Sequence, residues 1–259
     1  MPVVTYYHSS MDESPSFPES FDDPRITPQF CRRLPGPDGD LVLVGVVHDH
    51  PASVARVERV LERIEPETVA LELPAIAVPL YRVYARDRAD DAASPRFGGE
   101  MSAAIRAAPE ADPVGIDAPN WSFLRLLVRR LVADRVSAGT ARRVLASVGG
   151  ATREALACRV AATLTHATSM TVVPGTKAEY DCDRDDSPER QADHERAHVA
   201  GVQALLGGVD TDGTALSYRD DTREQCMIDR LEDLRAESGD VVAVVGVDHL
   251  ERLATDLSS

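Results

Sequence analysis

Apolar residues in this chain gather into short runs, separated by longer segments in which apolar and polar residues alternate with helical spacing. Runs of this kind, when turn-forming residues bound them, are typical of strands that are buried on both faces. The sequence predicts four such strands, at residues 41–47, 68–74, 113–117 and 241–246. A turn signal at 35–40 also predicts a short strand around Cys31, which forms a hairpin with the first of them.

Between the strands, apolar residues recur every three or four positions, which is the spacing of amphipathic helices. This pattern predicts helices at about residues 53–65, 76–90, 100–108, 122–136, 139–168, 192–207 and 220–234, and a short helix after the last strand. Strands that alternate with helices are typical of an α/β fold. We therefore expect a mostly parallel central sheet flanked by helices, with a helical insertion at about 122–215.

Composition divides the chain into two parts. Residues 9–28 are rich in Ser, Pro, Asp and Glu, so residues 1–30 are predicted to form an acidic, flexible leader. Residues 31–259 are predicted to form a single domain. The sequence has neither a signal peptide nor a run of roughly 20 apolar residues, so we expect no membrane span. Scattered cysteines without a CxxC pair indicate reduced thiols and a cytoplasmic protein.

The charge balance is strongly acidic, with 43 Asp and Glu against 28 Lys and Arg and a net charge of −15. Nucleic acids and anionic membranes are bound by basic patches, so this balance argues against both as partners. An acidic surface is also typical of a halophilic protein, because high salt screens the repulsion between like charges.

Two of the predicted strands are followed by the same short motif, Gly-x-x-His. In the first copy Gly45 precedes His48, and in the second copy, about 200 residues later, Gly246 precedes His249. In an open α/β sheet, ligands bind beyond the carboxyl ends of the strands. The repeated motif therefore indicates that two histidines meet at one site.

Carboxylates end the other two strands, where Glu72 and Asp117 lie. Two imidazoles with one or two carboxylates are a ligand set that suits Zn²⁺, Mn²⁺ or Co²⁺. Such an ion activates water and polarises a carbonyl group, which predicts a hydrolase.

A different metal motif lies in the middle of the chain. His194, Glu195 and His198 form the pattern H-E-x-x-H of zincin proteases, in which two histidines bind zinc and the glutamate is the general base. The helix around it is highly charged, and Arg196 lies inside the motif. A solvated helix with two histidines on one face is the competing interpretation.

The short motifs at the strand ends resemble the TraB/PrgY family, which belongs to one superfamily with GumN, the TIKI proteins, ChaN and the erythromycin esterases. The matching segments are GVVH (45–48), ALELP (70–74), GGEM (98–101), GID (115–117), REQCMIDRL (223–231) and VVGVDH (244–249). The resemblance covers about 41–125 and 218–254. Many archaeal relatives carry C-terminal membrane segments, and this sequence shows none before it ends at Ser259, so the chain looks like a soluble, haloarchaeal-type member.

This resemblance implies a metal-dependent hydrolase that acts on a peptide or another amide or ester. It also implies a role in the inactivation of peptide signals, and a homodimer. It implies that a divalent Mn, Co or Zn ion is held by His48, His249 and Glu72. It further implies catalytic roles for Glu72, Glu100 and Asp117, substrate contacts by Arg125, Arg230 and Glu224, and motif glycines at Gly45, Gly98, Gly99 and Gly246. Ala118 and Phe123 depart from the family pattern beside Asp117.

A non-catalytic function is the alternative from another class. The same fold and the same residues would serve a binding or regulatory protein that sequesters a peptide or a metal ion, because members of one superfamily differ in chemistry.

Overall fold

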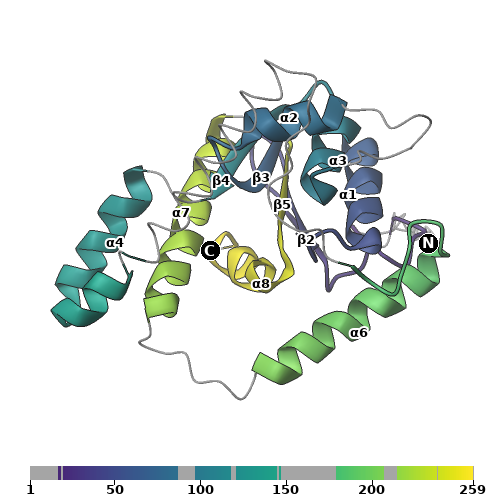
Figure 1. The fold of residues 1–259 in the computed structure, drawn as a ribbon. Coiled ribbons are helices and arrows are strands. Elements are labelled where there is room, and N and C mark those ends of the chain that lie inside the picture. The colour runs from purple at the N-terminus through teal and green to yellow at the C-terminus, as the bar shows by residue number, and fades with distance from the viewer. Residues whose placement is uncertain are drawn as a thin grey trace, which may run out of the picture.

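The computed structural model describes residues 17–18, 20–86, 97–117, 121–144, 146, 179–206, 215–237 and 239–258. The chain has an α/β fold, in which helices cover both faces of a five-stranded, mostly parallel sheet (Figure 1). The strands are β1 (Cys31–Leu34), β2 (Leu41–Val46), β3 (Thr68–Pro74), β4 (Asp112–Asp117) and β5 (Val241–Gly246). The helices are α1 (Pro51–Ile64), α2 (Val78–Arg86), α3 (Gly99–Ala107), α4 (Trp121–Ala133), α6 (Pro188–Leu206), α7 (Ala215–Glu237) and α8 (Val247–Asp256).

The order of strands in the sheet is β1-β2-β5-β3-β4. The hairpin predicted at the start of the sheet is confirmed, since β1 is antiparallel to β2. The other neighbours are parallel, and β5, the last strand in sequence, lies between β2 and β3. The carboxyl ends of β2, β3 and β5 therefore lie side by side at one edge of the sheet.

The strands are apolar throughout because successive side chains point to opposite faces of the sheet, and helices cover both faces. In β2, Val42 and Val44 pack against α1 and α3 on one face, while Leu41 and Leu43 pack against α7 and α8 on the other. Both faces are covered by helices, so neither set of side chains is polar. Gly45 lies inside this strand. A Cβ there would come within 2.9 Å of the Leu250 side chain in α8, so close packing of that helix favours glycine at this position.

Helix α1 begins directly after the turn that carries His48. Pro51 occupies its first turn, and the Nδ1 atom of His50 accepts a hydrogen bond from the Ala52 N–H at 3.1 Å, so an imidazole provides the N-cap. The helix ends at Ile64 before a left-handed residue, Glu65. His50 is fully buried, and it therefore fixes the start of α1 beside the carboxyl end of β2.

Packed structure begins earlier than the predicted domain boundary at residue 31. Ile26 and Phe30 are buried in the core beside β2 and α1, so the leader cannot extend to residue 30 as predicted. Aliphatic and aromatic side chains in a mainly polar segment are enough to anchor it.

The predicted insertion at 122–215 is described only at its two ends, where α4 packs on α7 and α6 packs on α1 (Figure 1). Beyond residue 146, the predicted helix at 139–168 lies outside the described residues, and so do residues 207–214. Within the described part of the chain, no helix has the length and apolar character needed to cross a bilayer.

Candidate functional site

A cavity of about 330 Å³ opens at the carboxyl edge of the sheet. Its lining includes Glu72 from β3, His48 from the turn after β2, and His249 from the helix after β5. The strands β2, β5 and β3 are neighbours in the sheet. Arg223 from α7, His198 from α6 and Asp248 from α8 complete the polar part of the wall. The structure thus brings together the two Gly-x-x-His motifs and the glutamate-bearing strand around one cavity.

A buried glutamate orients His48. The His48 Nδ1 atom lies 2.6 Å from Glu100 Oε1, and the second carboxylate oxygen of Glu100 accepts the Asp49 N–H at 2.9 Å. Glu100 is in the first turn of α3, which starts beside this turn only because Gly98 and Gly99 both adopt positive φ. A Cβ on Gly99 would lie 2.3 Å from Asp49 Oδ1. The two glycines therefore position the His48 partner.

This partner changes the protonation of His48. The hydrogen bond to Glu100 raises the pKa of His48 to about 9, and the nearby charges of Glu72 and Asp49 act in the same direction against the effect of burial. His48 is therefore an imidazolium at neutral pH and can donate a proton. Because the folded pKa lies above that of the unfolded chain, the pairing stabilises the fold fully below about pH 6.5 and loses its effect as the pH rises through 9.

The His48 titration is a direct test of this pairing. We expect the His48 ring protons to titrate near pH 9 in NMR spectra, and we expect Glu100→Gln to lower that pKa towards its ordinary value of about 6.5. The matched variant Glu224→Gln removes the partner of the other histidine and should leave the His48 titration unchanged. A His48 pKa near 6.5 in the wild-type protein would contradict the geometry.

His249 is held in a parallel way in the first turn of α8. Its Nδ1 atom lies 2.7 Å from Glu224 Oε1, and its Nε2 atom lies 3.5 Å from Glu72 Oε1. Burial lowers the pKa of His249, but the hydrogen bond to Glu224 and the charge of Glu72 outweigh it, so the pKa is raised. The Gly246 N–H donates to Glu72 Oε2 at 2.5 Å. A Cβ at this glycine would lie 3.3 Å from the same oxygen, so Gly246 makes room for the carboxylate.

Arg223 links the carboxylates of two strands. Its guanidinium donates two hydrogen bonds of 2.8 Å to Asp117 at the end of β4 and one of 3.0 Å to Glu72. The sequence pointed instead to Arg125 and Arg230. Arg125 is exposed on α4, Arg230 forms an ion pair within α7, and neither lines the cavity. Arg223 belongs to the motif that carries the family resemblance, but its orientation depends on how α7 packs.

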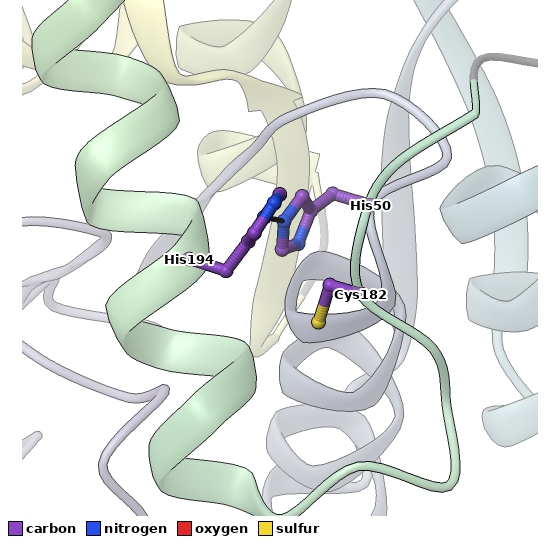
Figure 2. Close-up of side chains that lie close together, drawn as sticks. All are labelled: His50, Cys182 and His194. Carbon is purple, nitrogen blue, oxygen red and sulfur yellow. Dashed lines mark hydrogen bonds between the residues drawn. The ribbon is translucent and has the colours of Figure 1, made fainter.

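The predicted metal ligands do not form a compact set. One group among the described residues is compact enough, and it consists of His50, Cys182 and His194 (Figure 2). The ligand atoms of these three residues all lie within 4.8 Å of one another. This group could hold a metal ion. The sequence did not reveal this group because its members come from the turn before α1, the loop before α6, and α6 itself. The only signals were His50 in the segment HDHP and His194 in the H-E-x-x-H motif.

The H-E-x-x-H motif is divided between two places. The His194 Nδ1 atom lies 2.9 Å from His50 Nε2, whereas His198 lines the cavity. Glu195, which a zincin would use as general base, is fully buried in an ion pair with Arg56. The two histidines therefore do not share a site and the glutamate is not accessible, which argues against the zincin alternative.

Comparisons with protein-family models, with curated proteins and with solved structures find no match to this chain. The resemblance to the TraB/PrgY family therefore remains a prediction from short motifs, and the function is argued from the site.

Proposed function

We propose that the protein is a hydrolase that cleaves an amide or ester bond, with a peptide as the first candidate substrate, in the cavity at the carboxyl edge of the sheet. The observation that carries this proposal is the pair of oriented histidines. Glu100 holds His48 at Nδ1, and Glu224 holds His249 at Nδ1. In each ring Nε2 is thereby left for proton transfer, which is how catalytic histidines are oriented.

In the proposed reaction, water adds to the substrate carbonyl carbon and the bond from that carbon to nitrogen or oxygen breaks. His249 in its neutral form accepts a proton from the attacking water at Nε2, and Glu72 beside that atom stabilises the resulting imidazolium. His48 donates a proton to the leaving group, which its raised pKa permits. Arg223 lies on the cavity wall, where a guanidinium stabilises the developing negative charge.

The present hydrogen bonds of the cavity residues favour this acid–base reaction over a reaction that uses a metal ion bound to His48, His249 and Glu72. Imidazoles and a carboxylate fit Mn, Co or Zn in kind. However, Glu72 already accepts hydrogen bonds from Arg223 and from the Gly246 N–H, and His48 holds a proton at neutral pH. A metal ligand must be deprotonated, so His48 would lose the proton on Nε2 while keeping its Nδ1 hydrogen bond to Glu100, and Glu72 would have to exchange its present hydrogen bonds for the ion.

The first experiment is a hydrolysis screen of the full chain in high salt, with fluorogenic peptides and p-nitrophenyl esters. We expect turnover by the wild type that persists after treatment with a chelator. Turnover that the chelator abolishes and Mn²⁺, Co²⁺ or Zn²⁺ restores would replace the acid–base mechanism by a metal-dependent one. No turnover of either substrate class would favour a binding or regulatory protein instead.

A further inference from the structure

The cluster of His50, Cys182 and His194 lies apart from the catalytic groups proposed above. Figure 2 shows the two imidazole rings facing each other between the α1 start and α6, with the cysteine of the preceding loop close by. His50 and Cys182 are buried, with exposed fractions of 0% and 5%. Ligand atoms of all three residues lie within 4.8 Å of one another. One thiolate and two imidazoles form a donor set that Zn²⁺ prefers.

We propose that these three residues bind a zinc ion, which fastens α6 and the loop 179–187 to the N-cap of α1. The ion would take the place of the hydrogen bond between His50 Nε2 and His194 Nδ1, which are 2.9 Å apart. Three protein ligands leave one position of a tetrahedral zinc site for a water molecule. The proposal is independent of the proposed hydrolase activity, because none of the three side chains lines the cavity.

The proton balance of binding follows from the hydrogen bonds. Because the His50 Nδ1 atom accepts the Ala52 N–H, His50 carries its proton on Nε2 and donates it to His194. When zinc binds at Nε2, the His50 proton moves to Nδ1 and the Ala52 N–H loses its acceptor. The Cys182 thiol gives up its proton to solvent, so each ion releases one proton in all.

The proposed zinc site is linked to the cavity through Tyr180. Tyr180, two residues before Cys182, donates a hydrogen bond of 2.7 Å to the His48 carbonyl oxygen, and its ring packs on those of His50 and His194. Zinc at the cluster would hold Tyr180 in place, and thereby the backbone of the turn that carries His48.

Cobalt substitution tests the proposal with a readout other than activity. Titration of the metal-free full chain with Co²⁺ should produce a thiolate-to-cobalt charge-transfer absorption that saturates at one ion per chain and is displaced by Zn²⁺. The variant Cys182→Ser should lose this absorption. Two matched variants should keep it: Cys226→Ser, which removes another buried thiol, and His48→Ala, which alters the cavity. Circular dichroism of each variant establishes that it is folded.

Two results would overturn the proposal. One is the absence of thiolate absorption in the wild type, and the other is absorption that persists in Cys182→Ser, which would assign it to another cysteine. Loss of hydrolysis in His48→Ala with the cobalt absorption retained would bear on the cavity alone, so the failure of one proposal is distinguishable from the failure of the other.

Discussion

Glu195→Ala is expected to lower the free energy of unfolding by about 3–5 kcal/mol, because it leaves a charged guanidinium buried without its partner. Arg56 and Glu195 are both fully buried and form a direct ion pair. Arg56 also donates hydrogen bonds to the carbonyl oxygens of Arg25 and Gly45 and packs over the Phe30 ring, so it cannot turn towards solvent. Urea unfolding followed by circular dichroism would measure the change as a lower midpoint.

Asp193→Ala is the matched control for this experiment. Asp193 lies two residues earlier on the same helix and pairs with Arg196 at the surface, where an ion pair contributes about 0–1 kcal/mol. High salt should remove what little effect the control has and leave the Glu195→Ala effect largely intact, because a buried pair is screened much less. Equal and small losses in both variants would show that Arg56 finds another partner or solvent when Glu195 is gone.

His48→Ala is expected to reduce kcat/KM for hydrolysis by about 10²–10⁴-fold, the usual contribution of a positioned general acid. The profile of kcat/KM against pH should rise as His249 loses its proton and fall near pH 9 as His48 loses its own. Glu100→Gln keeps the imidazole but removes the partner that raises its pKa. That variant should shift the falling limb to lower pH and cost less activity than His48→Ala.

Two arginines on α7, one inside the cavity and one outside it, test whether the cavity is the site of hydrolysis. Arg223→Ala removes the group that bridges Glu72 and Asp117, so we expect a large loss of hydrolysis. Arg230→Ala alters an arginine outside the cavity and should have little effect, although the family resemblance assigns it a substrate contact. If His48→Ala retains wild-type activity and Arg230→Ala loses it, the reaction takes place elsewhere on the protein.

The sequence was a good guide to the sheet and to part of the site. Strands buried on both faces are recognisable as uninterrupted apolar runs, and parallel strands place their following residues at a common edge. These two rules were enough to bring His48, His249 and Glu72 to one cavity, while the family resemblance pointed to Glu100.

The orientation of Arg223 and the burial of Glu195 depend on contacts between elements that are distant in the sequence, so the sequence did not reveal them. Helix α7 packs on the sheet and α8 through Met227 and on α4 through Cys226, so its apolar positions do not mark a single face. The periodicity therefore could not show whether Arg223 or Arg230 turns towards the cavity. Burial of Glu195 likewise depends on Arg56, which lies 139 residues away in the sequence.

The position of β5 between β2 and β3 has a consequence for how the protein folds. Leu41 is paired with Val241, 200 residues later in the sequence, and β2 and β3 gain their shared neighbour only when β5 is in place. Pairings this distant in sequence form slowly, because a long loop must close before any contact compensates for the lost chain entropy. While the ribosome is still making the chain, β2 and β3 therefore have open hydrogen-bonding edges, which are prone to aggregation. The cavity proposed as the active site is also incomplete until β5 has been made.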